Sequence, residues 1–325
     1  MTAEAGGWYF HHFRGQTAVK VVFNGNTSPQ SGDITVDIAE AWVDERGDLW
    51  DMDPELLRHV AWPGGKYKAA VLSFDDGNVQ DRPFVALLNK YGVVGTFNLN
   101  SGRLGTPTYI AASEVATLFA GHEVATHSVT HPYLSSLSEA QIKAELANDR
   151  AALEALVPYT VRGHAYPFGD YNDTVLKVMK QVGLVYGRVV PQTKDLRLPS
   201  QLLVWRGSCH HTCAHPLVQD LIAWNKKEMA LLQIWGHSWE LDGGGPGADW
   251  AYMESLLKLL GNKTDIWYAK AIDVADYLLA LRKLEWSAEL ERVKNGSTIS
   301  IWVKNTAGDA VELKPGASIA VGVLP

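Results

Sequence analysis

The chain has 325 residues, of which 29 are Lys or Arg and 36 are Asp or Glu, giving a formal net charge of −7. Nucleic-acid-binding proteins usually carry a basic face, so this balance argues against that class. The sequence contains no apolar run of about 18 residues, which excludes a predicted membrane-spanning helix. Apolar residues make up 46% of the chain, which is enough to bury a large core.

The first residues, MTAEAGGWYFHHFRG, lack the basic and then apolar segments of a secretory signal. We therefore expect a cytoplasmic protein, or an extracellular one whose leader was removed. Two cysteines, Cys209 and Cys213, are too few for a disulfide framework in a chain of this length. The 12 tryptophans fit either core packing or a cleft that stacks on sugar rings.

From residue 69 onward, segments with the pattern of buried strands alternate with segments of helical periodicity. The predicted strands lie at residues 68–74, 93–99, 122–127, 161–168, 184–190, 229–237 and 265–269. The predicted helices lie at residues 82–92, 113–121, 138–156, 173–183, 248–261 and 273–284, with Ser138 as the expected N-cap of the third. Repeated strand–helix units of this length imply parallel strands with helical crossovers. We predict an α/β fold, a closed or nearly closed parallel (β/α) barrel of about seven units.

Both ends of the chain show shorter alternating segments that are rich in turn residues. Residues 17–25 and 32–50 predict a β hairpin or meander with turns at Asn24-Gly25 and Arg46-Gly47. Residues 297–305 and 311–323 predict further strands. We therefore expect an N-terminal β-rich extension (1–62), a barrel (63–285) and a C-terminal β-rich extension (286–325), with the small β elements packed on the barrel.

In such barrels, chemically active side chains gather at the C-terminal ends of the strands. Asp75 and Asp76 follow the first predicted strand, and these adjacent carboxylates raise each other's pKa unless a positive charge lies nearby. His127 and His131 are four residues apart, so both imidazoles can bind one ion from the same face of a helical turn. One Asp with two imidazoles suits a catalytic divalent ion, and the other Asp can then act as a base on metal-activated water. The alternative is that Asp75 only caps a turn.

The stretches LSFDDG, THSVTHP, AYPFGDYN and IWGHSWEL occur in this order. They resemble the successive motifs of the polysaccharide deacetylases, which are the NodB-homology or carbohydrate esterase family 4 enzymes. The resemblance covers roughly residues 66–284. It implies a distorted parallel (β/α) barrel with fewer than eight regular strands, a divalent metal that is usually zinc, and an acetylated carbohydrate as substrate.

The resemblance also implies a role for each matching residue. Asp75 is then the general base, and His237 is the general acid that protonates the leaving group. The implied metal ligands are Asp76, His127 and His131.

Further residues are implied around the substrate. The backbone N–H of Phe168, which follows Pro167, is expected to help hold the oxyanion. Tyr166, in AYPFGDYN, and Trp239, in IWGHSWEL, are the other residues expected to contact the substrate. Glu240, three residues after the general acid, either raises the pKa of that imidazole or faces solvent.

The chain departs from the family pattern at one position. The third motif usually carries an Arg two residues before its proline, where it pairs with the catalytic Asp, and this chain has Ala165 there. We hypothesise that Arg162 or Arg188 supplies the guanidinium instead, with Arg188 favoured. The alternative is that both are ordinary surface arginines.

The stretch SCHHTCAH concentrates cysteines and histidines. It fits a second zinc site, a substrate-facing loop with His210 or His211 near the cleft, or structural packing. The spacing does not match the usual paired C-x-x-C zinc pattern. Tyr133, Asn98 and Asn100 are further cleft candidates that could equally bind local backbone.

These patterns predict a metal-dependent hydrolase that removes N- or O-acetyl groups from a carbohydrate, most simply with zinc. One alternative is a metal-dependent amidase or imidase on a small molecule, but relatives of that kind tend to lose the carboxylate pair. The other is a non-catalytic glycan-binding protein, but a decayed site would have lost at least one of the residues named above. We expect no nucleic-acid or membrane partner, and the glycan, the native metal and the oligomeric state are left open.

Overall fold

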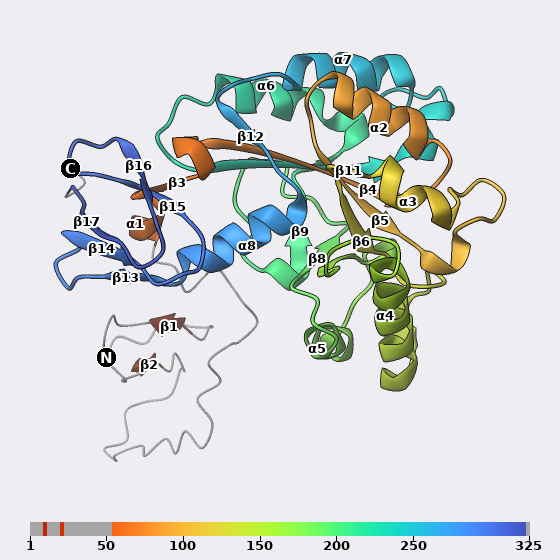
Figure 1. Cartoon of the computed structure of the whole chain (residues 1–325), viewed down its shortest axis with the longest axis horizontal. Coiled ribbons are helices and arrows are strands. Elements are labelled where there is room, and N and C mark those ends of the chain that lie inside the picture. The colour runs from red at the N-terminus through yellow and green to blue at the C-terminus, as the bar shows by residue number, and fades with distance from the viewer. Residues whose placement is uncertain (1–8, 12–19, 23–53, 323–325) are drawn as a thin grey trace, which may run out of the picture.

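The fold is a curled, mainly parallel sheet surrounded by helices, with small antiparallel sheets beside it (Figure 1). The structure is a computed structural model that describes residues 9–11, 20–22 and 54–322. The main sheet has nine strands, and all of its strand pairs are parallel. The predicted α/β barrel class is therefore confirmed.

The strands of the main sheet alternate with helices along the chain. The strands are β4 (Lys68–Asp76), β5 (Gly95–Leu99), β6 (Glu123–Thr126), β7 (Gly163–Ala165), β8 (Tyr186–Val189), β9 (Trp205–Arg206), β10 (Cys209–His210), β11 (Ala230–His237) and β12 (Ile266–Tyr268). The spatial order is β10-β11-β4-β5-β6-β7-β8-β9, and β12 pairs with the first residues of β4. Along the chain, a helix lies between each consecutive pair of strands from β4 to β8 and between β10 and β11, which is the crossover that parallel pairing requires.

The two ends of this order are linked by one short piece of chain. Only Gly207 and Ser208 separate β9 from β10 in sequence. The segment 205–210 therefore pairs with β8 at its start and with β11 at its end. This single segment bridges the gap in the curled sheet, which gives a distorted barrel with fewer regular strands than the eight of a standard (β/α) barrel.

The helices cover the outside of the sheet (Figure 1). They are α2 (Asp81–Lys90), α3 (Val115–Leu118), α4 (Glu139–Glu154), α5 (Asp173–Gln181), α6 (His215–Ala223), α7 (Trp250–Leu260) and α8 (Ala271–Leu281), after a short α1 (Pro54–Leu57). The predicted N-cap of α4 is confirmed, because the Ser138 hydroxyl accepts from Gln141 N–H and Gln141 bonds back to Ser138 N–H. The helix predicted over 113–121 is only one turn long. It contains the β-branched Val115 and Thr117 and is followed by Gly121 at φ 87°.

Antiparallel strands from both ends of the chain pack together. One sheet joins β13 (Leu284–Trp286), β14 (Arg292–Asn295) and β17 (Ser318–Ala320), and the other joins β16 (Ala310–Leu313), β15 (Ile301–Lys304) and β3 (Val60–Ala61). The strand β3 lies just before β4 in the chain, so the C-terminal β elements are held next to the start of the first barrel strand. Tyr277 of α8 strengthens this junction, because its hydroxyl donates to Ala61 O and accepts from Trp302 N–H.

Part of the N-terminal prediction lies outside the described residues. The described strands there are β1 (Tyr9–His11) and β2 (Lys20–Val22), which pair antiparallel. The predicted turns at Asn24-Gly25 and Arg46-Gly47 fall outside the described ranges. Among the helices of the described part of the chain, none is both long enough and apolar enough to cross a bilayer.

Part of the interior of the sheet is polar. Near its middle, the buried Glu123 carboxylate accepts from Tyr186 Oη–H at 2.9 Å, Thr96 Oγ1–H at 2.8 Å and Ile272 N–H at 3.0 Å. These bonds connect three strands with the start of α8. Nearer the starts of the strands the inner face is apolar, and Ala69, Val71, Tyr186 and Leu231 belong to one buried cluster there. Further apolar clusters lie between the sheet and its outer helices. The polar interior leads directly to the C-terminal strand ends.

Candidate active site

The register of three parallel strands brings polar side chains together at the end of β4. Asp75 is the partner of His237 on β11 and of Asn98 on β5. Residues in register on neighbouring parallel strands point to the same face. Asn98 Nδ2 accordingly donates to Asp75 Oδ1 at 2.9 Å and to Ser73 Oγ at 2.9 Å. Asn98 therefore bonds the side chains of the site and does not bind local backbone alone.

Asp75 is ion-paired with Arg188, and both side chains are almost fully buried. Arg188 Nη2 donates to Asp75 Oδ2, and the guanidinium also lies over the Trp235 ring at 4.8 Å. Burial alone would raise the pKa of Asp75. The charge of Arg188, followed by those of His127 and His237, outweighs burial and lowers this pKa to about 2. The first carboxylate of the pair is thus held ionised.

Arg188 occupies the place of the guanidinium that is missing at Ala165. The two residues are register partners on β8 and β7, so the side chain comes from the neighbouring strand at the same height. Arg162 lies elsewhere, because it precedes β7 at the opposite end of the strand. There it makes two bonds to Asp276 of α8, at 2.9 and 2.5 Å. Of the two candidates, only Arg188 contacts Asp75.

The second carboxylate faces the two predicted imidazoles. Asp76 Oδ1 lies 3.7 Å from His127 Nε2 and 3.8 Å from His131 Nε2, and all three donor atoms are within 4.8 Å of one another. Zinc bound to nitrogen and oxygen at about 2.0–2.2 Å places tetrahedral ligand atoms roughly 3.4 Å apart, so this set is close to coordination distance.

The imidazoles also have the protonation that metal ligands need. His127 Nδ1 lies 2.7 Å from Ala165 O, which fixes the proton on Nδ1 and leaves the Nε2 lone pair facing Asp76. Burial, helped by His127, lowers the pKa of His131 to about 4, so His131 is neutral at pH 7. The residues present therefore fit a divalent metal ion of the zinc class.

Strained backbone marks the same place. Four residues have φ between 59° and 82°, a backbone region that residues other than glycine rarely adopt: Asp76, Ser128, His131 and Phe168. Such residues persist only where surrounding contacts hold them, and they cluster at functional sites. These four residues lie at the end of β4 and in the loops that follow β6 and β7, and four other non-glycine residues with positive φ lie elsewhere in the described chain.

Two buried residues hold the loop that carries the histidines. Asn100 Nδ2 donates to His127 O at 2.5 Å and to Ser128 O at 2.9 Å. Asp149 of α4 accepts from His127 N–H at 2.9 Å and from Ser101 N–H at 2.8 Å. Burial raises the pKa of Asp149 to about 7. Sequence reasoning left Asn100 open and missed Asp149, because its position depends on how α4 packs.

The general-acid candidate lies on the other side of Asp75. His237 Nε2 is 3.9 Å from Asp75 Oδ2, and His237 Nδ1 is 3.2 Å from Glu240 Oε2. Burial works to lower the pKa of His237, but the adjacent Glu240 carboxylate and the charges of Asp75 and Asp76 raise it overall. Glu240 therefore faces His237 and not solvent.

Aromatic rings flank the opening of the site. Phe168 is 50% exposed and stacks on Tyr133, which is 56% exposed, with ring centroids 4.0 Å apart. The edge of His131 meets the same Phe168 ring at 4.6 Å. Trp239 is 44% exposed and donates from Nε1 to Asp76 Oδ2 at 2.9 Å. Exposed rings gathered around one opening suit contact with a ligand.

Three residues that were predicted to contact the substrate are buried in the structure. The Tyr166 side chain is buried, and its hydroxyl donates to Leu203 O at 2.8 Å, so it packs in the core under α5. Pro167 is buried and supports the Phe168 turn. His211 is completely buried, whereas His210 remains partly exposed beside Glu240. Of this group, only His210 is reachable from the opening.

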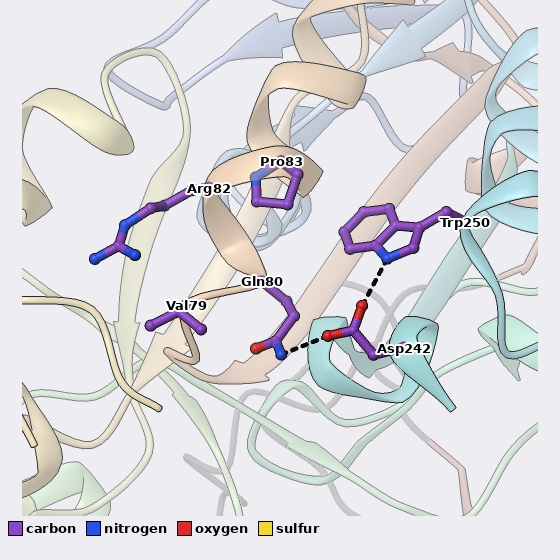
Figure 2. A pocket seen from close by; sticks show the side chains of 6 residues that line it. All are labelled: Val79, Gln80, Arg82, Pro83, Asp242 and Trp250. Atoms are coloured by element: carbon purple, nitrogen blue, oxygen red, sulfur yellow. Dashed lines mark hydrogen bonds between the residues drawn. The ribbon is translucent and has the colours of Figure 1, made fainter. Parts of the chain in front are cut away.

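A separate pocket of about 540 Å³ lies beside the same loops (Figure 2). It is lined by Val79, Gln80, Arg82, Pro83, Asp242 and Trp250. Asp242 accepts from Gln80 Nε2 at 2.7 Å and from Trp250 Nε1 at 2.8 Å, which ties the loop after β4 to the turn after β11. The lining includes none of the residues placed around Asp75, so the pocket adjoins the site without containing it.

Comparison with known proteins finds a family match for part of the chain. The family model for polysaccharide deacetylases matches residues 60–187, the segment that carries Asp75, Asp76, His127, His131 and Phe168. This segment belongs to the polysaccharide deacetylase family. The match begins at β3 and ends within β8, before the strand that carries His237.

Two relatives and one solved structure illustrate the likeness to polysaccharide deacetylases. Chitooligosaccharide deacetylase of Sinorhizobium fredii is 30% identical over 133 residues, which are 40% of this chain and 60% of the relative. Chitin deacetylase 1 of Cryptococcus neoformans is 28% identical over 121 residues, which are 35% of this chain and 24% of the relative. A crystal structure from Mycobacterium smegmatis that is assigned to the polysaccharide deacetylases has a TM-score of 0.52 at 17% identity. That match covers 69% of this chain and 94% of the other. The chain thus shares the deacetylase fold and spans less than two thirds of either relative.

Proposed function

We propose that this protein is a metal-dependent hydrolase that removes acetyl groups from a carbohydrate. The observation that carries the proposal is the arrangement around Asp75. This carboxylate is held ionised by a buried Arg188. It lies in sequence beside the Asp76–His127–His131 donor set and faces a His237 that Glu240 supports from behind. A base, an acid and a cation site converge on one opening.

Asp76, His127 and His131 would hold the ion. A bound divalent ion polarises a carbonyl oxygen and lowers the pKa of water, which is the chemistry that amide or ester hydrolysis needs. Asp75 can take a proton from the attacking water, because its carboxylate is ionised and can accept one. His237 gives its own proton to the leaving group. As the products leave, Asp75 releases the proton it took to solvent and His237 regains one from solvent, so both residues return to their starting forms.

His237 is the residue that returns a proton to the leaving amine or alcohol. Its raised pKa keeps the imidazole protonated to higher pH, as a general acid near neutrality requires. The Phe168 N–H sits in a turn with φ 59°, and it is the donor in none of the loop and turn backbone hydrogen bonds among the described residues. It is free to donate to the oxyanion, an interaction worth roughly 3–4 kcal/mol in comparable sites.

The carbohydrate class is supported by the surface around the opening. The exposed faces of Phe168, Tyr133 and Trp239 suit stacking on the apolar face of a sugar ring. The two relatives named above are described as acting on chitin and chitooligosaccharides. We therefore place an acetylated sugar, with its acetyl group pointing toward Asp75, in the opening between these rings.

Acetate release from a substrate panel tests this proposal. The panel comprises acetylated xylan, chitooligosaccharides, poly-N-acetylglucosamine, peptidoglycan fragments and simple acetylated sugars. We expect release from at least one member, loss of that activity after chelation, and recovery when zinc is restored. Activity that survives complete removal of metal would contradict the metal-dependent mechanism. No release from any member would remove the carbohydrate assignment.

His131→Ala tests the ligand set directly. We expect this variant to lose the tightly bound ion, because two of three protein ligands hold a divalent cation far more weakly. Metal content per chain, measured after extensive dialysis, gives the result without any assay of activity. His215→Ala is the matched control, since His215 contacts Ser255 and is not part of the Asp76–His127–His131 donor set. Unchanged metal content in His131→Ala would overturn the ligand assignment.

A further inference from the structure

A second cluster of imidazoles surrounds the far side of Glu240. Glu240 Oε2 lies 3.1 Å from His210 Nε2, 3.2 Å from His237 Nδ1 and 3.6 Å from His211 Nδ1. The cluster forms because β10 and β11 are paired, with His210 opposite Trp235, and both strands end here. Glu240 reaches back to it from the 3₁₀ turn Ser238–Asp242. One carboxylate oxygen thus meets three imidazoles.

We propose that His210, His237 and Glu240 form a second, weaker binding site for a zinc-class divalent cation, and that filling it silences His237 as a proton donor. The binding itself is independent of the enzyme's activity. Only its inhibitory consequence rests on the proposed function. The cysteines of SCHHTCAH take no part, because Cys209 is buried and the Cys213 thiol donates to His210 O.

The donor set has the geometry and chemistry of a zinc site. The ligand atoms of the three residues all lie within 4.8 Å of one another, and two of the separations, 3.1 and 3.2 Å, approach the roughly 3.4 Å expected between tetrahedral zinc ligands. Two imidazoles and one carboxylate favour zinc, nickel or copper over magnesium or calcium, which prefer oxygen ligands. The three side chains are 16%, 22% and 23% exposed, so an ion can enter from the opening.

The tautomer of His210 is compatible with this role. Its Nδ1 has two contacts with Thr212: the hydroxyl Oγ1 lies 2.9 Å away, and the backbone N–H approaches at 3.5 Å. The shorter contact is satisfied when Nδ1–H donates to Oγ1. That arrangement leaves the Nε2 lone pair for the ion, as in most protein zinc sites. The other nitrogen of His237, Nε2, points toward Asp75, so the two cation sites use opposite sides of the acid and base pair.

A buried imidazole without a partner supplies an independent indication. His211 is completely buried, and neither of its ring nitrogens has a hydrogen bond. Leaving buried polar atoms unpaired is costly. When an ion takes the lone pairs of His210 and His237, the Glu240 carboxylate no longer has to serve these two rings. Glu240 Oε2, which lies 3.6 Å from His211 Nδ1, then uses one lone pair for the ion and can offer the other to His211 Nδ1–H.

The consequence for His237 follows from which atom the ion would use. Nδ1 of His237 carries the proton that faces Glu240 when the ring is an imidazolium. An ion on Nδ1 takes the place of that proton, so the ring can no longer cycle between its neutral and protonated forms. General acid catalysis contributes about 10²–10⁴ in rate. Saturating the second site should therefore lower turnover by ~100-fold or more.

Zinc binding by equilibrium dialysis tests the site without any substrate. We expect the wild-type chain to bind two zinc ions, one tightly and one more weakly. His210→Gln should keep the tight ion, which also shows that the variant is folded, and should bind the second ion at least ~100-fold more weakly. The controls His215→Gln and Cys213→Ser should still bind two ions. A wild type that binds one ion, or a His210→Gln variant that binds the second equally well, would overturn the proposal.

Inhibition by excess metal tests the consequence. For each variant, turnover with excess zinc is divided by its own turnover with one equivalent. This ratio should be ~100-fold below one in the wild type and close to one in His210→Gln. Excess magnesium should leave the turnover of the wild type unchanged. Equal inhibition of both proteins would overturn the silencing of His237. If no acetylated substrate is turned over, the proposed function fails, and the dialysis result still decides the second site.

Discussion

Replacing Asp75 by Asn is expected to lower turnover by about 10³-fold or more while the chain keeps its tightly bound metal. The expectation follows from the geometry, because Asp75 is the carboxylate that is ionised and paired with Arg188, whereas Asp76 faces the two imidazoles. Asn has the same shape but cannot accept a proton from water, so it removes the general base, a group worth about 10²–10⁴ in rate. The measurement pairs steady-state turnover on the best panel substrate with metal content per chain.

A conservative change at an unrelated carboxylate controls for the loss of a charge. Asp265→Asn removes the partner of Lys68 in an exposed ion pair, far from the strand ends. Exposed pairs of this kind contribute little to stability, so its turnover should match the wild type. If Asp75→Asn lost its metal together with its activity, Asp75 would be a ligand and the base would have to be sought elsewhere.

Arg188→Met is expected to move the acidic limb of the pH–rate profile upward by about 1–3 pH units. In the wild type, Arg188 and the nearby imidazoles outweigh burial and lower the pKa of Asp75 to about 2, so the base stays ionised throughout the working range. Without the guanidinium, burial becomes the dominant influence and raises this pKa. Asp75 is then protonated, and inactive as a base, at pH values where the wild type is fully active. The full profile of kcat/KM between pH 4 and 9 gives the result.

The same substitution should change stability with a definite dependence on pH. A carboxyl whose folded pKa lies below its usual value of 3.8 contributes stability above that value, and the contribution is lost as pH falls toward 2. Removing Arg188 reverses the sign, because a buried carboxylate without its partner destabilises the fold at neutral pH. Breaking a buried ion pair costs about 3–5 kcal/mol, measurable by denaturant unfolding at pH 7.

Arg162→Met is the matched control for Arg188→Met. It removes the same functional group, a guanidinium, but Arg162 precedes β7 and lies at the end of that strand opposite the site. Its partner there, Asp276 of α8, is partly exposed. The control should therefore keep the wild-type pH profile. Profiles that coincide for Arg188→Met and the wild type would show that the guanidinium does not set the protonation of Asp75.

The parts of the site that lie at strand ends were predictable from the sequence. Parallel strands place their C-terminal ends at one edge, so Asp75, Asp76 and His237 had to be neighbours once the strand pattern was recognised. The replacement of the missing Arg by Arg188 was predictable for the same reason, since the end of the next strand lies beside Ala165. Arg162 could have been discarded on this ground, because it precedes its strand.

The remaining parts depend on packing that sequence patterns do not reveal. His210 and His211 are adjacent in sequence, yet one reaches the opening and the other is sealed in the core. Tyr166 follows a strand end, but its ring turns toward α5. Asp149 reaches His127 N–H only because α4 lies against β6. In each case the direction of a side chain, and not its position along the chain, decides its role.

The pairing of β3 with β15 has a consequence for how the protein comes apart. Val60 and Ala61 are held by the C-terminal strand Ile301–Lys304, and Trp62, next in sequence, is locked to Ala230 O at the start of β11. Strands within residues 286–322 thus hold the start of β4, the strand that carries Asp75 at its C-terminal end. A chain cut near residue 285 would lose these contacts at the start of β4. Damage at the C-terminus would therefore disturb Asp75, although the two are far apart in sequence.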